Sequence, residues 1–193
     1  MTGLFDADDG ATPLPPEERN GLIPTHVSLR SELNELEQKN IAAADSWAFS
    51  RKRNVTDESF LRNLHRRMFD NVWRWAGEYR TTERNLGVAP YRIQPDLVQT
   101  LGDARYWIEH NTYAPDELAV RFHHKLVSIH PFPNGNGRWS RLAGDLMAVH
   151  LGASRFSWGS ANLQAGGVRQ TYIDALHAAD AHDLAPLMNF ARS

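Results

Sequence analysis

The stretch His130-Pro-Phe-Pro-Asn-Gly-Asn-Gly-Arg138, followed by Arg141, constrains the fold and chemistry of this 193-residue sequence more than any other. It combines an imidazole, a loop of small residues and two guanidiniums. Gly tolerates φ > 0, and Asn tolerates it better than most residues, so such a loop can turn its backbone N–H groups toward one anion. The stretch therefore predicts a polyphosphate-binding loop at the N-terminus of a helix, with His130 as the nearby group that titrates near neutral pH.

The apolar spacing on both sides of this loop predicts an all-α domain. Asp57 or Thr56 is the candidate N-cap of the second helix. The fourth helix must end near His130, because Pro131 disfavours helical geometry in the residue before it. In the fifth helix the predicted core stripe is Trp139, Leu142, Leu146 and Val149. The predicted helices are 29–49, 60–72, 97–108, 118 to about 130, 136–150, 168–179 and a short one ending near residue 190.

The segment 79–93 interrupts the helical pattern. Thr81 and Thr82 precede the turn-forming residues 85–87, and Val88 and Ile93 follow them. Two short extended arms around a turn predict a small β-hairpin.

Composition limits the class of protein. Residues 1–24 are acidic and proline-rich, which predicts an extended arm, and we expect 25–193 to form one domain. The net charge of -2 argues against a nucleic-acid-binding protein that makes most of its contacts with phosphates. No cysteine is present, so a disulfide framework and a thiol nucleophile are excluded. No run is long and apolar enough for a membrane helix, and we expect a cytoplasmic protein.

The loop and the helix after it, HPFPNGNGRWSR, resemble the Fic/Doc family motif HPFx(D/E)GNGRxxR. The similarity continues outside the loop. The segment 75–80 resembles the start of the family's flap, and 172–183 resembles its closing helix. With 21–24 and 32–38, the chain is similar to the Fic subgroup called mobile mystery protein B. The resemblance implies a Fic-type helical domain with one small β-hairpin flap at 79–93 and a catalytic loop at 130–138.

The resemblance implies an enzyme that transfers AMP from ATP to a hydroxyl side chain of another protein. His130 would be the general base that takes the proton of the attacking hydroxyl. Backbone groups of the loop would stabilise the α- and β-phosphates, and the two arginines would hold the β- and γ-phosphates. The implied nucleotide-binding residues are Gly135, Asn136, Gly137, Arg138 and Arg141.

Asn134 departs from the family pattern. The family places Asp or Glu there to bind Mg²⁺, or Mn²⁺, and a neutral amide oxygen is a weaker ligand for a hard cation. Asn134 is thus a weak metal candidate, which leaves open a metal held mainly by phosphates, a slower enzyme or a different phosphate-containing donor. A nucleotide-binding regulatory module with little transferase activity is a further alternative. A metal hydrolase built on His123, His124 and His130 is disfavoured, because adjacent helical residues point about 100° apart.

The flap gives a hypothesis for target binding. An exposed extended edge can pair with a target segment and place its hydroxyl over the catalytic base. The candidate docking residues are Leu86, Val88 and Tyr91, and an ordinary connecting loop is the alternative.

Regulation is also implied by the resemblance. Many Fic proteins inhibit themselves with a helix carrying (S/T)xxxE(G/N), whose Glu pairs with the second motif arginine. The run Ser31-Glu-Leu-Asn-Glu35 matches this in Ser and Glu, which makes Glu35 the candidate inhibitory residue and Arg141 its expected partner. Inhibition by an antitoxin is the alternative. The subgroup also implies a helix-turn-helix companion protein, and the family a homodimer, in a bacterial cytoplasm, with no direct contact to nucleic acid.

Overall fold

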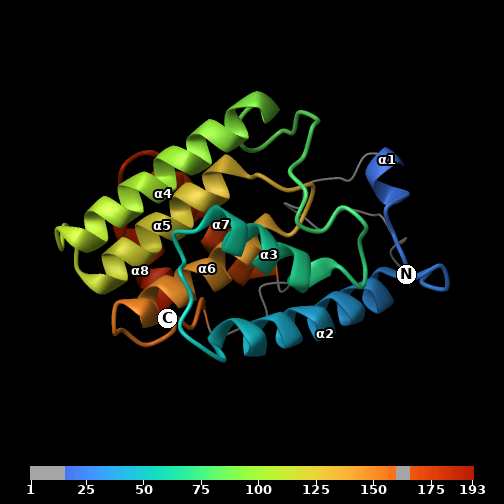
Figure 1. The fold of residues 1–193 in the computed structure, drawn as a ribbon, viewed down its shortest axis with the longest axis horizontal. Helices are drawn as coiled ribbons and strands as arrows, with labels where there is room; N and C mark the ends of the chain where they lie inside the picture. Colours follow the sequence, from blue (N-terminus) through green and yellow to red (C-terminus); the bar gives the residue numbers. More distant parts are fainter. Residues whose placement is uncertain (1–15, 160–165) are drawn as a thin grey trace.

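The structure, a computed structural model, describes residues 16–159 and 166–193 (Figure 1). Most of the predicted N-terminal arm lies outside these residues. The part that is described contains a short helix and an isolated antiparallel bridge between Leu22 and Trp73. The elements are α1 (Pro16–Arg19), α2 (Arg30–Phe49), α3 (Glu58–Phe69), the 3-10 helix η1 (Pro90–Arg92), α4 (Ile93–Glu109), α5 (Pro115–Ile129), α6 (Asn136–His150), α7 (Gly166–Asp180) and α8 (Ala185–Arg192).

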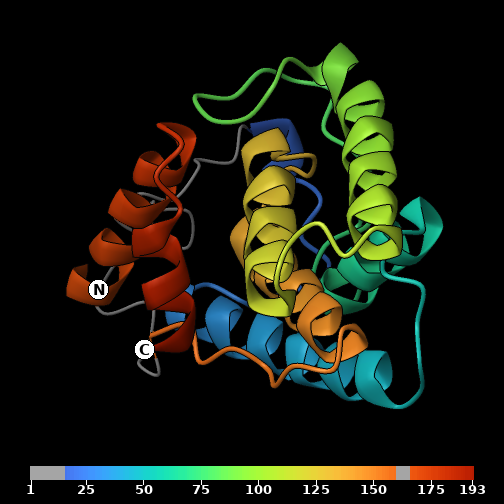
Figure 2. The same cartoon turned by 90° about the vertical axis from the view of Figure 1, so that its left-hand side faces the viewer.

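Helices α5 and α6 form the centre of the molecule. In Figure 2 the green α4 covers one side of α5, the red α7 and α8 cover the other, and the blue α2 crosses beneath. Helix α3 packs against both α2 and α6. The helices share one apolar core. Its largest fully buried side chains include Trp73, Trp139, Phe69, Phe122 and Phe132.

The helix boundaries follow local sequence signals. Asp57 caps α3 by accepting the Ser59 N–H at 2.8 Å, as predicted. Helix α6 spans the predicted residues 136–150. Its predicted core stripe is wrong at one position, because Val149 is 43% exposed in the last turn.

The predicted β-hairpin at 79–93 is not present; the segment is an irregular loop that ends in η1. Its two arms bond to a third segment instead of to each other. The Arg80 N–H donates to the Pro131 carbonyl at 2.9 Å, and the Val88 N–H donates to the Ile129 carbonyl at 3.3 Å. The Arg80 guanidinium donates hydrogen bonds to the carbonyls of Thr82 and Val88. Because these groups are already bonded, a cross-strand ladder cannot form.

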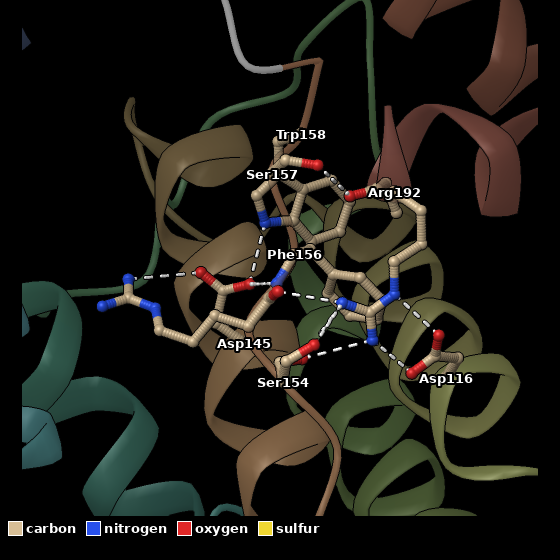
Figure 3. Close-up of polar contacts among 9 residues, drawn as sticks. Asp116, Asp145, Ser154, Phe156, Ser157, Trp158 and Arg192 are labelled. Atoms are coloured by element: carbon tan, nitrogen blue, oxygen red, sulfur yellow. Dashed lines mark hydrogen bonds and ion pairs between the residues drawn. The ribbon is translucent and has the colours of Figure 1, made fainter.

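A polar clamp fixes the C-terminal part of the domain (Figure 3). Asp145 of α6 accepts the backbone N–H of Phe156 at 3.1 Å and the indole N–H of Trp158 at 3.0 Å. Arg192 of α8 donates to both carboxylate oxygens of Asp116 at the start of α5. The clamp therefore joins the last helix to both central helices.

Across the described ranges, 16–159 and 166–193, the helices are too short or too polar to cross a lipid bilayer.

Candidate active site

The catalytic loop begins and ends with left-handed residues. His130 terminates α5 with φ 53, as the following Pro131 predicts, and Gly135 precedes α6 with φ 79. A Cβ on Gly135 would overlap the ring of Phe69, so only glycine fits at this point. The backbone thus turns sharply at both ends of the loop, where α5 ends and where α6 begins.

Asn136 holds the loop closed. Its side chain is 1% exposed and bonds residue 132 twice, accepting the Phe132 N–H at 2.9 Å and donating to the Phe132 carbonyl at 2.8 Å. The amide side chain is therefore structural, and what Asn136 offers an anion is its backbone N–H. The first amides of a helix have no intrahelical acceptor, so those of Asn136 and Gly137 suit the predicted anion site.

Arg141 lies beside the N-terminus of α6. A Cβ on Gly137 would be 3.5 Å from Arg141 Nη1 and 3.9 Å from the Tyr172 hydroxyl. The Arg141 guanidinium stands over the Tyr172 ring, 5.1 Å from its centroid. Tyr172 in turn bonds His123, with its hydroxyl 3.1 Å from Nε2. Arg141 and Gly137 therefore lie together, as predicted, and a buried pair of side chains supports the arginine.

Arg138 is bonded to an acid that the sequence prediction missed. Its Nη1 lies 2.6 Å from Glu37 Oε2, and Glu37 also accepts the Trp73 indole N–H at 2.7 Å. Glu37 is only 4% exposed. The predicted acid, Glu35, is wrong as the partner of a motif arginine, because its exposed carboxylate pairs with Lys39 at 2.9 Å.

The sequence contained a signal for Glu37. Positions on one face of a helix recur every three or four residues, so an acid among the apolar residues of that face must be buried. Glu35 lies off this face and therefore reaches solvent. The buried residues of α2 are Leu33, Glu37, Asn40, Ala44 and Ala48.

Flap residues pack directly against His130. A Cβ on Gly87, which has φ 88, would overlap the Cβ of His130. The Arg80 side chain, 3% exposed, donates to the His130 carbonyl at 2.7 Å. Arg80 thus bonds both the flap and the end of α5, a role that the sequence did not reveal. The flap fixes the backbone from which the candidate base projects.

His130 is neutral at physiological pH. Burial, together with the guanidiniums of Arg80 and Arg84, lowers the pKa of His130 to about 4. A neutral imidazole has one unprotonated nitrogen, which is the form that a general base needs. The position and charge state of His130 therefore fit a general base, although a lowered pKa also makes it a weaker one.

Both oxygens of Asn134, in its side chain and in its main chain, already have hydrogen-bond partners. Its side-chain oxygen accepts the Gly135 N–H, and its carbonyl lies 3.0 Å from His65 Nε2. Within residues 16–159 and 166–193, no group of three or more His, Cys, Asp or Glu side chains could hold a metal ion. An amide oxygen that already accepts a hydrogen bond is a weaker metal ligand than the carboxylate that the family pattern places at this position. Of the three histidines of the hydrolase alternative, His123 bonds Tyr172 and His124 pairs with Asp180 at 2.8 Å.

The candidate docking residues differ in exposure. Tyr91 is 81% exposed and Leu86 is 44% exposed, whereas Val88 packs partly against the core. Tyr91 lies in η1, just before α4. Two of the three are thus exposed at the surface of the flap.

Comparisons with known proteins identify sequences and structures that this chain resembles. Residues 55–148 match the sequence model of the Fic/DOC family. The protein adenylyltransferase fic-1 of Caenorhabditis briggsae is 33% identical over 131 residues, or 66% of this chain and 25% of the relative. Its namesake from Caenorhabditis elegans is 32% identical over 133 residues, again 66% and 25%. The chain spans only about a quarter of the length of these curated relatives.

Solved structures share the fold. The N-terminal Fic domain of a VirB-translocated Bep effector protein from Bartonella quintana has a TM-score of 0.71 at 16% identity, covering 89% of this chain and 90% of that one. BepC from Bartonella tribocorum, solved with bound AMPPNP, has a TM-score of 0.69 at 17% identity, with 91% and 96% covered. The helical arrangement predicted from the sequence is therefore confirmed, apart from the hairpin.

Proposed function

The chain belongs to the Fic/DOC family through residues 55–148, and on that premise we propose that it is a protein adenylyltransferase. It would move AMP from ATP to a hydroxyl side chain of a target protein. The observation that carries this proposal is the placement of a neutral His130 and the N-terminus of α6 at opposite ends of one closed loop. The names of the Caenorhabditis relatives and the AMPPNP in BepC support an adenine nucleotide as donor.

Each step has a group on this chain to perform it. The target hydroxyl oxygen attacks the α-phosphorus, the bond from that phosphorus to the β-phosphate oxygen breaks, and pyrophosphate leaves. His130 accepts the proton of the hydroxyl. Backbone N–H groups at the start of α6 stabilise charge on the phosphates, and Arg141 orients them for in-line attack. Arg138 joins Arg141 once it is released from Glu37.

We assign the inhibitory role to Glu37 in place of Glu35. Bound to Glu37, the Arg138 guanidinium has Nη1 2.6 Å from a buried carboxylate, so a phosphate must compete with that carboxylate for it. The family pattern expects an acid to pair with the second arginine, whereas here the acid pairs with the first. An active enzyme then requires separation of this pair, and α2 carries the restraint.

We propose that a magnesium ion would bind together with the donor nucleotide. Because the amide of Asn134 is a weaker ligand than a carboxylate, Mg²⁺ or Mn²⁺ would be bound mainly through the phosphates of ATP. Asn134 then contributes through its hydrogen bonds and not as a strong ligand.

The test is transfer of label from ATP labelled on the α-phosphate, with Mg²⁺ and a bacterial lysate. The protein is compared with His130→Ala and Glu37→Gly, and the modified residue is identified by mass spectrometry. We expect label on protein, more of it with Glu37→Gly and none with His130→Ala. Label that persists in His130→Ala would contradict the assigned base.

A second function has one observation in its favour. The Glu37–Arg138 pair and the neutral Asn134 are also what a nucleotide-binding regulatory module without transfer would carry. That alternative predicts ATP binding, measured by calorimetry, with no transfer even in Glu37→Gly. Label from a differently substituted phosphate donor would instead identify another transferase.

Several expectations about context remain predictions. We propose that 25–193 is the catalytic domain, that the protein acts in a bacterial cytoplasm, and that an antitoxin or helix-turn-helix companion controls it. Copurification from the native host tests the companion, and light scattering tests the homodimer.

A further inference from the structure

His65 of α3 is buried between residues 75–77, which precede the flap, and the catalytic loop, although neither the motif nor the proposed chemistry uses it. Its side chain is 0% exposed. The ring stacks on Phe132, with centroids 3.6 Å apart and planes at 14°. Phe69 and Trp75 contact it at centroid distances of 4.8 and 6.3 Å. A polar ring in such surroundings needs partners for both nitrogens.

The two partners of His65 fix its charge and its tautomer. The Gly77 N–H donates to Nδ1 at 3.0 Å, so Nδ1 carries no proton. Nε2 therefore carries the proton and donates it to the Asn134 carbonyl, also at 3.0 Å. A second proton on Nδ1 would point at the Gly77 donor. Burial lowers the pKa of His65 to about 3, so the neutral form persists through the physiological range.

The residues that His65 holds belong to two different parts of the site. Asn134 directly precedes Gly135, the cap of α6, so its carbonyl sets where that helix begins. Gly77 precedes Arg80, whose guanidinium bonds the His130 carbonyl at 2.7 Å. One imidazole thus connects the helix N-terminus that would receive phosphates with the segment that anchors the base.

We propose that His65 is a positioning residue for the transfer reaction: by bonding the Asn134 carbonyl and the Gly77 amide at once, it sets the spacing between His130 and the N-terminus of α6. This inference rests on the proposed adenylyltransferase function. A misplacement of about 1 Å can cost roughly 100-fold in rate, so loss of these bonds should lower kcat. ATP affinity should change less, because both arginines project from α6 itself.

Three substitutions separate the two hydrogen bonds. His65→Phe keeps a ring to stack on Phe132 and removes both bonds. His65→Gln returns a donor that reaches the position of Nε2, and His65→Asn returns an acceptor near the position of Nδ1. Leu118→Ala is the stability control: Leu118 is 1% exposed and lies in the first turn of α5, about 16 Å along the helix axis from Ile129.

The experiment measures kcat and the KM for ATP in a Glu37→Gly background, at a temperature where every variant is folded. We expect His65→Phe to lower kcat by about 10- to 100-fold with the KM within about 3-fold, and His65→Gln to recover most of the loss. His65→Asn should recover less. Unchanged kcat in His65→Phe, or an equal loss in Leu118→Ala, would overturn the proposal.

A second readout does not require activity. Hydrogen exchange at the Gly77 and Gly135 amides should be at least about 10-fold faster in His65→Phe than in the parent, and unchanged in Leu118→Ala. If no variant transfers AMP but exchange responds in this way, the proposed function fails while the role of His65 in the loop stands. Unchanged exchange would refute that role independently.

Discussion

Two buried carboxylates in this molecule have the same kinds of partner and different consequences. Asp145 accepts the indole N–H of Trp158 at 3.0 Å and lies 3.4 Å from Arg155 Nη2. Glu37 accepts the indole N–H of Trp73 at 2.7 Å and lies 2.6 Å from Arg138 Nη1. Their exposures, 5% and 4%, are nearly equal.

The arginines make the difference. Arg155 also bonds Asp45 at 2.6 Å and has no part in the catalytic loop, so the Asp145 clamp of Figure 3 can only hold the fold together. Arg138 belongs to the loop that would bind phosphates, so the same arrangement around Glu37 competes with a ligand. A buried ion pair is thus structural or regulatory according to what else its cation could bind.

The largest predicted effect is the loss of stability when the structural carboxylate, Asp145, is removed. Asp145→Ala leaves the Trp158 indole and the Phe156 N–H without an acceptor, and should lower the free energy of unfolding by about 3 kcal/mol. Urea denaturation measures this. ATP affinity should not change, since none of these residues lies in the loop. A variant that bound ATP differently would show that the two regions are coupled.

The next largest effect is on the rate of AMP transfer when the proposed regulatory carboxylate, Glu37, is changed. Glu37→Gln keeps the shape of the side chain, loses its charge and releases Arg138, so transfer should rise by roughly 5- to 150-fold, the usual size of coupling between sites. Initial rates of AMP transfer measure it. Glu35→Gln, which alters only an exposed pair with Lys39, is the matched control and should leave the rate unchanged.

Three buried histidines and Asp145 should also change the stability with pH in opposite directions. Burial lowers the pKa values of His65, His123 and His130 to about 3, 3 and 4, so the unfolded chain binds their protons first. The stability they contribute is full above about pH 6.5 and is lost as pH falls toward 4, at up to about 1.4 kcal/mol per pH unit for each. Burial raises the pKa of Asp145, so its contribution is greatest at low pH and is lost as pH rises through that pKa.

Denaturation at a series of pH values tests this. Stability of the parent should fall below pH 6.5, and His65→Phe should fall with a shallower slope, because one titrating group is gone. An unaltered slope in His65→Phe would mean that this histidine is not held neutral.

The smallest effect concerns the flap. Gly87→Ala and Gly152→Ala both place a side chain at positive φ, 88 and 84, and the backbone strain alone should cost each about 1 kcal/mol of stability. Only the first also overlaps His130; the second has nothing within 4 Å. Transfer should therefore fall in Gly87→Ala and not in Gly152→Ala. Equal rates would show that contact between flap and base is dispensable.

Sequence alone predicted the features that depend on neighbours in the chain. The bounds of α6, the end of α5 near His130 and the Asp57 cap follow from local backbone preferences, and all are confirmed. The hairpin was wrong because the Arg80 side chain takes the carbonyls that a second strand would need, and no pattern of alternating residues reveals such a contact.

For the candidate site, too, the sequence predicted only what residues close together in the chain determine. The motif residues of the loop lie together, but their partners come from elsewhere in the chain. His65 bonds groups 12 and 69 residues away, and Glu37 bonds one 101 residues away. Glu37 alone left a local trace, as an acid on the buried face of α2.

The order of Glu37 and Arg138 along the chain has a consequence for synthesis. Because they are 101 residues apart, α2 leaves the ribosome well before the arginine that it holds is translated. The loop would therefore fold onto an acid that is already present. On the function proposed above, Arg138 can therefore pair with Glu37 as soon as the loop folds. Newly synthesised molecules would then be inhibited from the start and would not modify other proteins before they are regulated.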